Sequence, residues 1–180
     1  MERGLLGPRE VPRLWERHIL NSAVVTELIP GPCTVVDLGS GAGLPGILIA
    51  MLMPGCQVTL VESSLRRAVF LEEAVAALDL PNASVRRSRA EDLAGELTAD
   101  VVTARAVARL PALAEWSLGL LRPGGLVLAI KGESAAAELA AARQALRRLG
   151  ARDTAISHVG SGKVDPATTV VSFIKEPVMG

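Results

Sequence analysis

The sequence predicts an α/β fold in which helices cover both faces of a mostly parallel sheet of seven strands. Three observations lead to this prediction. Short apolar runs rich in valine, isoleucine and leucine alternate with longer amphipathic runs along the chain. A glycine-rich turn at residues 39–43 follows the first of the short runs. The last two short runs follow each other without a helix between them, which is typical of an antiparallel hairpin.

Length and composition fit one globular domain. The chain has 180 residues, of which 49% are hydrophobic and 21% charged, with 19 basic and 19 acidic side chains. Such a chain is too short for two catalytic domains and too apolar for disorder. We therefore expect a single domain over residues 1–180, with residues 1–30 as a helical extension at its amino terminus.

Several kinds of site and location are disfavoured. Cys33 and Cys56 are the only cysteines, and neither belongs to a Cys/His cluster, so we expect no metal. The chain starts without the apolar run of a signal peptide, and its longest apolar stretch, residues 44–53, is too short to cross a bilayer. We expect a cytoplasmic protein with no membrane contact.

The elements follow in a regular order. An opening helix is predicted from Pro12, a favoured first helical position, to about Leu28, where Pro-Gly-Pro at residues 30–32 ends it. Parallel strands are predicted at residues 34–38, 57–62, 84–87, 100–104 and 126–130, and helices at 45–53, 65–78, 111–121 and 133–149. Residues 121–125 are predicted to form a turn before the fifth strand.

The predicted hairpin joins residues 155–159 and 169–175 through a glycine-rich turn. A parallel sheet closed by such a hairpin is typical of the class I (Rossmann-like) methyltransferases. A dinucleotide-dependent dehydrogenase would normally continue with another strand and helix instead.

The glycine turn predicts a cofactor site. Asp37 ends the first strand and is followed by Gly39, Gly41 and Gly43, at the sheet edge where open α/β sheets bind ligands. Glycines allow a ligand to lie against the backbone, and Asp37 is placed to meet a ligand ammonium group, directly or through water. The position of the turn favours S-adenosylmethionine, although residues 41–46 also match the dinucleotide pattern G-x-G-x-x-G.

Residues after the second and third strands extend this site. Glu62 closes the second strand, where a carboxylate can accept both ribose hydroxyls, and Ser63 and Ser64 either assist the ribose or cap the next helix. Ala90 and Glu91 follow the third strand and either contact the adenine edge or cap a helix.

Several stretches resemble the RsmG (GidB) family, the bacterial 16S ribosomal RNA guanine-N7 methyltransferases. The most specific stretch is Glu-Arg-His-Ile-Leu-Asn-Ser at residues 16–22, ahead of the glycine turn and of Leu-Pro-Gly at residues 44–46. The matching segments are residues 7–10, 15–22, 37–46, 67–72, 90–92, 105–106 and 131–132. The family pattern has a longer helical segment before Gly7 than the six residues present here, a departure that bears on RNA affinity more than on cofactor binding.

The resemblance implies a cofactor, a substrate and a set of site residues. The cofactor is S-adenosyl-L-methionine, the product S-adenosyl-L-homocysteine, and the partner 16S rRNA or the small ribosomal subunit, with the guanosine at position 527 as target. We expect the protein to be a monomer. The cofactor residues implied are Gly39, Leu44, Glu62, Ala90, Glu91 and Arg105.

Guanine N7 carries no proton at neutral pH, so its methylation by in-line displacement needs no general base. Arg105 follows the fourth strand, where amine methyltransferases place their polar residues. We expect Arg105 to act in catalysis by positioning, through guanine O6, a phosphate or the cofactor carboxylate. A structural ion pair with Asp37 or a neighbouring acid is the alternative.

RNA contacts are expected on the opening helix and at the sheet edge. Arg13, Arg17 and Asn21 are spaced as one polar stripe of a helix that faces away from Trp15. Trp15 and Trp116 are expected in the core. The residues expected to bind RNA are Arg9, Arg13, Arg17, His18 and Lys131.

Three other functions remain open on the sequence. A small-molecule methyltransferase would use the same cofactor site, but the few aromatic residues argue against an aromatic pocket. A NAD-binding oxidoreductase and a catalytically silent RNA-binding module are the other two.

Overall fold

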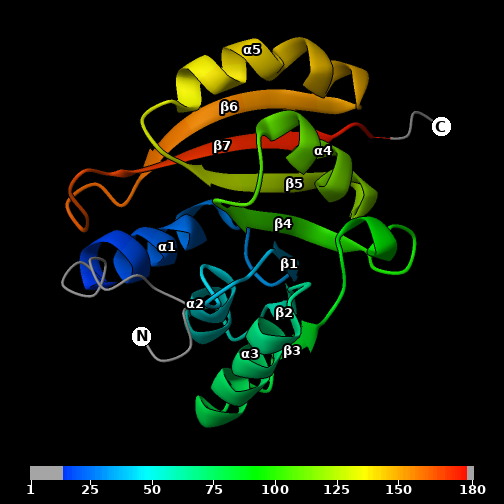
Figure 1. The fold of residues 1–180 in the computed structure, drawn as a ribbon. Helices are drawn as coiled ribbons and strands as arrows, with labels where there is room; N and C mark the ends of the chain where they lie inside the picture. Colours follow the sequence, from blue (N-terminus) through cyan, green and yellow to red (C-terminus); the bar gives the residue numbers. More distant parts are fainter. Residues whose placement is uncertain (1–13, 178–180) are drawn as a thin grey trace.

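The structure is a computed structural model that describes residues 14–177. Seven strands form one sheet in the order β3-β2-β1-β4-β5-β7-β6 (Figure 1). The strands are β1 Thr34–Leu38, β2 Gln57–Val61, β3 Ala83–Arg86, β4 Ala99–Arg105, β5 Leu121–Lys131, β6 Ala151–Val159 and β7 Thr168–Lys175. Pairs from β3 to β5 are parallel, and β7 pairs antiparallel with both β5 and β6. The predicted sheet and its carboxyl-terminal hairpin are confirmed.

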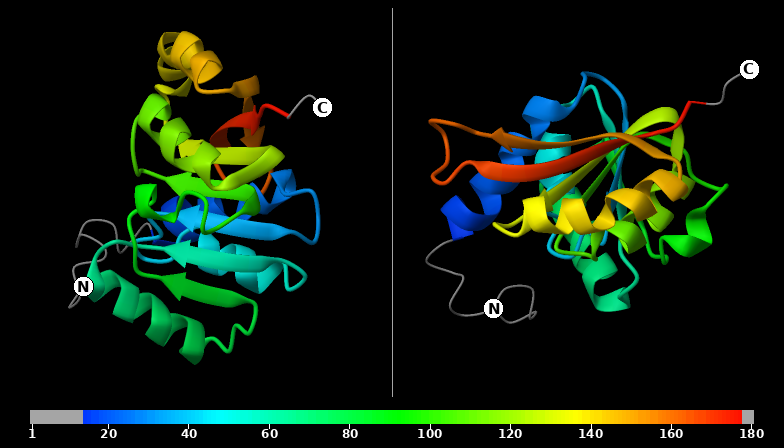
Figure 2. Two further views of the ribbon diagram at one scale, coloured as in Figure 1. Left: turned by 90° about the vertical axis from the view of Figure 1, so that its right-hand side faces the viewer. Right: turned by 90° about the horizontal axis from the view of Figure 1, so that it is seen from above.

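Helices lie on both faces of the sheet, as Figure 2 shows. The helical elements are η2 Leu14–Leu20, α1 Asn21–Ala23, η3 Val24–Leu28, α2 Gly46–Leu52, α3 Leu65–Ala77, η4 Glu91–Leu93, α4 Leu110–Gly119 and α5 Ala135–Arg148. The packing of α4 and α5 forms one hydrophobic cluster against the sheet, and that of η3, α2 and α3 forms the other.

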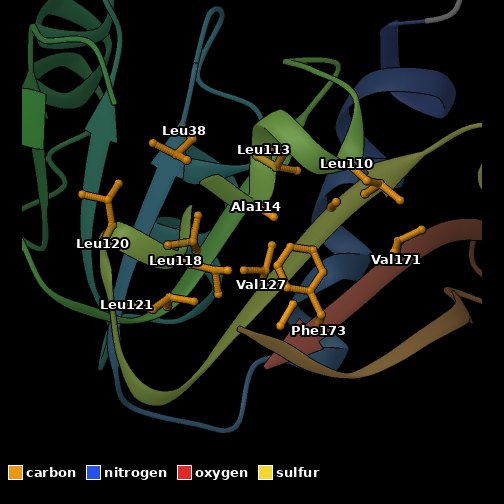
Figure 3. Close-up of a cluster of buried hydrophobic side chains, with 14 of the residues drawn as sticks. Leu38, Leu110, Leu113, Ala114, Leu118, Leu120, Leu121, Val127, Val171 and Phe173 are labelled. Carbon is orange, nitrogen blue, oxygen red and sulfur yellow. The ribbon is translucent and has the colours of Figure 1, made fainter. Parts of the chain in front are cut away.

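Alternation along β1 explains how one strand serves both clusters. Val36 and Leu38 belong to the cluster with α4 and α5, whereas Val35 belongs to the other. A strand covered on both faces carries apolar side chains on both of them, as β1 does at these three positions. Figure 3 shows the first cluster, in which the ring of Phe173 lies beside Val127.

The opening helix differs from the prediction. The described part is not one α-helix but a π-helical segment (η2), a single α-helical turn (α1) and a 3-10 helix (η3). The change to 3-10 geometry coincides with Val24-Val25-Thr26, three β-branched residues that disfavour the α-helix. The Thr26 hydroxyl also donates to the carbonyl of Ala23 at 2.7 Å, a bond that competes with helical pairing.

The fifth strand begins five residues earlier than predicted. Leu121 is buried and pairs with Ala99, whereas regular pairing resumes only at Leu126, opposite Val101. The predicted turn is therefore an irregular excursion within β5. Gly124 permits it, because this residue adopts a φ of 76°.

Candidate functional site

A cleft opens at the carboxyl edge of β1 and β2, beside the glycine turn, with a volume of about 440 Å³. We call it the glycine cleft. Its size lies in the range of sites that hold a small ligand. Its walls come from the ends of β1 and β2, the segment after β3, and the segment after β4. The strand ends bring these segments together as predicted for an open α/β sheet.

The glycine turn has the backbone conformation that its residues predict. Gly39, Gly41 and Gly43 have φ values of 64°, 57° and 86°, in the left-handed region. Side chains are also excluded by space: a Cβ at Gly39 would lie 2.9 Å from Val107, and one at Gly43 would lie 2.2 Å from Ile47. The turn therefore exposes backbone to the cleft and packs tightly beneath it.

Glu62 is the carboxylate of the glycine cleft. Its side chain is 4% exposed, and its two oxygens accept the backbone N–H groups of Gly41 at 3.1 Å and Ser64 at 2.8 Å. Arg67 Nη1 lies 3.7 Å from the oxygen that Gly41 binds. These contacts fix the orientation of the carboxylate, and each oxygen keeps a second lone pair that can accept a ligand hydroxyl.

Asp37 is buried below the turn rather than placed on the cleft wall. It is 1% exposed, and its oxygens accept the N–H of Gly46, the first residue of α2, at 3.1 Å and the hydroxyl of Thr103 at 3.0 Å. Burial raises the pKa of Asp37 to about 6, against the lowering effect of these hydrogen bonds. In the described structure this carboxylate joins β1, β4 and α2, and its contact with a ligand ammonium group remains a prediction.

The predicted cofactor residues divide between the cleft wall and its support. Gly39, Glu62, Ser63, Ala90 and Glu91 line the glycine cleft. Gly41 and Ser64 stand behind Glu62, while Gly43, Leu44 and Asp37 belong to the turn and its base. Ser64 and Ala90 occupy N-cap positions of α3 and η4, but neither makes a capping bond through its side chain. Direct contact of these residues with a cofactor stays a prediction.

Four further residues line the cleft without having been predicted from the sequence to do so: Arg67, Arg89, Val107 and Trp116. Trp116 is half-buried: it packs against the hydrophobic cluster of α4 and α5 and also faces the cleft. Arg67 is placed by helical geometry, in the first turn of α3 directly after Glu62 and the two serines. The sequence contained this signal, because Arg67 follows the strand-end acid Glu62 by only five residues.

Arg105 lies at the end of β4 but reaches the amino-terminal segment. Its Nη1 donates to the hydroxyl of Ser22 at 3.0 Å, and its Nη2 donates to the carbonyl of Arg17 at 3.2 Å and lies 2.5 Å from Nδ1 of His18. These partners lie on η2 and α1, and the positive charge of Arg105 also has a lowering effect on the pKa of Asp37, the acid expected as its alternative partner. Arg105 does not line the glycine cleft.

Three cavities meet at Ala106. This exposed residue has a φ of 55°, unusual for a side chain with a Cβ, and it lines all three. Beside the glycine cleft lie a cavity of about 590 Å³ next to the hairpin, the hairpin cleft, and one of about 670 Å³ against α5, the α5 cavity. Strained backbone of this kind gathers at functional sites.

The hairpin cleft collects part of the predicted cationic rim. It is lined by Arg17, Arg105 and Lys131, and by His158 from β6, which sequence reasoning did not select. Arg17 is exposed, whereas Lys131 is 14% exposed and forms an ion pair with Glu138 at 2.9 Å. Arg9 and Arg13 lie outside the described residues, and RNA contact by His18, Arg17 or Lys131 remains a prediction.

The expectation that Trp15 lies in the core is wrong. Its side chain is 67% exposed, on a segment whose buried contacts come from Ser22, Val24 and Val25 further along. η2 has π-helical geometry, in which residues three apart lie further from a common face than in an α-helix. The periodicity of an α-helix therefore does not place Trp15 in the core.

Among residues 14–177, no helix is long and apolar enough to cross a membrane. The same residues hold no group of three or more His, Cys, Asp or Glu side chains that would suit a metal ion.

Comparison with known proteins gives one family. The family model described as rRNA small subunit methyltransferase G matches residues 1–166. A protein of Thermobifida fusca named ribosomal RNA small subunit methyltransferase G is 60% identical over 169 residues, which cover 94% of this chain and 71% of that one. A protein of the same name from Streptomyces avermitilis is 54% identical over 172 residues, covering 95% and 72%.

Solved structures show the same fold at low sequence identity. A SAM-dependent methyltransferase from Aquifex aeolicus has a TM-score of 0.65 at 17% identity and covers 94% of this chain and 99% of that one. A SAM-dependent O-methyltransferase from Thermotoga maritima has a TM-score of 0.68 at 12% identity, with 95% and 71% covered.

Proposed function

The chain belongs to the rRNA small subunit methyltransferase G family, S-adenosylmethionine-dependent methyltransferases of ribosomal RNA, and on this premise we propose that it methylates N7 of a guanine in 16S rRNA. By resemblance to the family the target is the guanosine at position 527. One observation supports this proposal above the others: the glycine cleft, with its fixed carboxylate, meets the cationic hairpin cleft at Ala106.

The residues of the glycine cleft fit the methyl donor. Glu62 is an oriented carboxylate that can accept two ribose hydroxyls, and the turn at Gly39 offers bare backbone. Ala90 and Glu91 supply a backbone amide and a carboxylate for the adenine edge on the far wall. When bound, S-adenosylmethionine supplies an electrophilic methyl group on a sulfonium.

The protein's part in the reaction is to bind and align. The N7 lone pair is free at neutral pH, so no side chain has to remove a proton. Holding two reactants in line accounts for roughly 7–11 kcal/mol of barrier lowering in well-oriented reactions. The segment 105–109 borders all three cavities and is anchored by Arg105 to the amino-terminal segment. We assign Arg105 a positioning role through that anchor.

The amino-terminal segment belongs to the same domain in this proposal. Thr168 of β7 donates to Asn21 Oδ1 at 3.1 Å, and the N–H of Gly160 donates to Glu27 at 3.1 Å. With Arg105, these contacts tie the segment to β4, to β7 and to the loop after β6, all far away in sequence. Residues 1–180 then act as one domain with residues 1–30 as its extension, and we propose a cytoplasmic monomer whose partner is 16S rRNA or the small subunit.

The test is transfer of labelled methyl from S-adenosylmethionine to small subunits, or to naked 16S rRNA, that lack the modification, followed by mapping. The proposal expects label on one guanine and none when that guanine is replaced by 7-deazaguanine. Label on another atom or on no guanine would overturn the substrate assignment. Calorimetry with S-adenosylmethionine and NAD adds a check on the cofactor, since tighter binding of NAD would favour the oxidoreductase alternative.

A further inference from the structure

The α5 cavity lies beside the glycine cleft and has an unusual lining. It is formed by Ala137, Ala141 and Ala142 of α5, by segment 106–109, and by Lys131 and Glu138. Its wall at Ala106 and Val107 is shared with the glycine cleft. The cavity is therefore mostly apolar, holds one ion pair and the exposed side chain of Arg109, and adjoins the place where a methyl donor would bind.

The ion pair presents a fixed donor beside a fixed acceptor. Lys131 Nζ donates to Glu138 Oε1 at 2.9 Å and to the carbonyl of Ala108 at 2.8 Å, and Oε1 also accepts the N–H of Leu110 at 2.9 Å. Burial raises the pKa of Glu138, but the hydrogen bonds from Lys131 and Leu110 outweigh it and the pKa is lowered, so the side chain is a carboxylate. Within the described residues Oε2 has no recorded hydrogen-bond partner, and Lys131 keeps a third N–H.

This arrangement matches one nucleobase edge. The Watson–Crick edge of guanine carries the O6 acceptor next to the N1–H and N2–H donors, whereas adenine has a donor next to an acceptor in the opposite order. We propose that the α5 cavity receives the target guanine, that Glu138 accepts its N1–H and N2–H, and that Lys131 donates to O6. This inference rests on the proposed function and adds residues that select the base.

The orientation agrees with methylation at N7. The N1 and N2 groups lie on the side of the purine away from N7, so a guanine held through them at Glu138 has N7 free to face another wall. The wall at Ala106 and Val107 is the one shared with the glycine cleft. Alanines on α5 leave a flat, shallow apolar surface for the faces of a planar base, as recognition of an unstacked base requires.

The decisive experiment compares guanosine with inosine, which lacks only the 2-amino group, at the target position of an RNA substrate. Wild type should methylate the inosine substrate less efficiently, with kcat/KM reduced on the order of tenfold. Glu138→Gln should lower kcat/KM on guanosine by on the order of 10- to 100-fold and bring the guanosine-to-inosine ratio close to one. Glutamine cannot take the place of the carboxylate, because its amide NH2 group is a donor. That group would face either the donors of Lys131 and Leu110 or the donors of the base, and two donors form no hydrogen bond.

The outcomes separate the two proposals. If Glu138→Gln lowers both rates equally and keeps the wild-type ratio, Glu138 is only structural and the inference is overturned while the function stands. If wild type does not methylate guanine N7 at all, the proposed function falls, and the inference with it. Melting temperature and affinity for S-adenosylmethionine, measured on the same variant, show whether the fold and the glycine cleft are intact.

A second pair of variants tests occupancy of the cavity without touching the ion pair. Ala141→Phe places a ring inside the α5 cavity, whereas Ala140→Phe puts the same ring on the exposed surface of α5, outside the lining. We expect Ala141→Phe to lower RNA methylation at least tenfold with unchanged cofactor affinity, and Ala140→Phe to stay within twofold of wild type. Equal activities of the two variants would contradict a base in this cavity.

Discussion

The carboxylates of Asp37 and Asp100, at the two edges of the parallel sheet, differ in burial and in the direction of their pKa shifts. At the carboxyl edge, Asp37 and Glu62 are almost fully buried, and burial raises the pKa of Asp37 to about 6. At the amino edge, Asp100 is partly exposed and accepts the N–H of Thr34 at 2.8 Å, its hydroxyl at 2.7 Å, and the guanidinium of Arg122. The hydroxyl and N–H of Thr34 and then Arg122 lower the pKa of Asp100 to about 2.

The two carboxylates have opposite effects on the free energy of folding. A buried carboxylate with a raised pKa costs free energy of folding at neutral pH, whereas a carboxylate with a lowered pKa contributes to it. The costly carboxylate stands under the glycine turn and the favourable one at the opposite end of the sheet. The carboxyl edge of the sheet, where the glycine cleft lies, thus holds a buried carboxylate that lowers stability at neutral pH, as is common at functional sites.

The largest effect on stability is expected from Gly46→Ala, at the carboxyl edge of the sheet. A Cβ here would lie 2.3 Å from Leu60 Cδ2 and 2.7 Å from Asp37 Oδ2, both buried. We expect a loss of about 3 kcal/mol or more in the free energy of unfolding, measured with urea, because the packed carboxylate has no space to move into. Gly132→Ala is the control, since nothing lies within 4 Å of its Cβ position. A Gly46→Ala protein as stable as the control would contradict the tight packing.

Ionisation of Asp37 should make the stability of the protein depend on pH. Its pKa rises from an ordinary value of 3.8 to about 6 in the folded chain, so between these pH values the folded state binds more protons. Stability from this group is full below about pH 4 and is lost as pH rises through 6, a change on the order of 2–3 kcal/mol. Asp37→Asn should lack this slope when unfolding is followed from pH 4 to 7. Identical slopes in the two proteins would show that Asp37 is not the cause.

Glu62→Gln tests the binding function of the same edge. The variant replaces one of two oxygens that accept backbone N–H groups, and it weakens the acceptor for ribose hydroxyls. We expect affinity for S-adenosylmethionine to fall on the order of tenfold in calorimetry, or about 1.4 kcal/mol. Glu115→Gln, on an exposed position of α4, serves as the control. Unchanged affinity in Glu62→Gln would remove this residue from the site.

The smallest effect is expected at the amino edge. Asp100→Ala removes the acceptor for Thr34 and Arg122 and should lower the free energy of unfolding by about 1 kcal/mol at pH 7. Because the pKa of Asp100 is lowered, its contribution is present above about pH 4 and lost toward pH 2, so the difference from wild type should shrink in acid. Cofactor affinity should stay within twofold; a larger change would mean that the two edges are coupled.

Particular elements show how far the sequence predicts this molecule. The parallel strands were predictable because strands buried on both faces leave apolar runs, and the hairpin because its two short runs follow each other without a helix between them. The glycine turn and Glu62 were predictable because everything that builds that half of the glycine cleft lies within 30 residues. Trp116 also lines the cleft, but nothing in its local pattern separated it from core residues.

The amino-terminal segment and Arg105 show where prediction failed. The side of η2 on which Trp15 lies depends on the π-helical geometry of this segment. A search for a 3.6-residue period does not detect that geometry. Arg105 is hydrogen-bonded to Ser22, 83 residues away in the chain, and Thr168 to Asn21, 147 residues away. Such distant pairs leave no local pattern in a single sequence.

The sheet, the glycine turn and the family follow from the sequence alone, because periodicity, backbone freedom and contiguous motifs are local properties of the chain. The position of Asp37 below the turn, the ion pair of Lys131 with Glu138 and the meeting of three cavities at Ala106 depend on tertiary packing. Burial and partnership of a charged group depend on which distant segments pack around it. A single sequence does not record that packing.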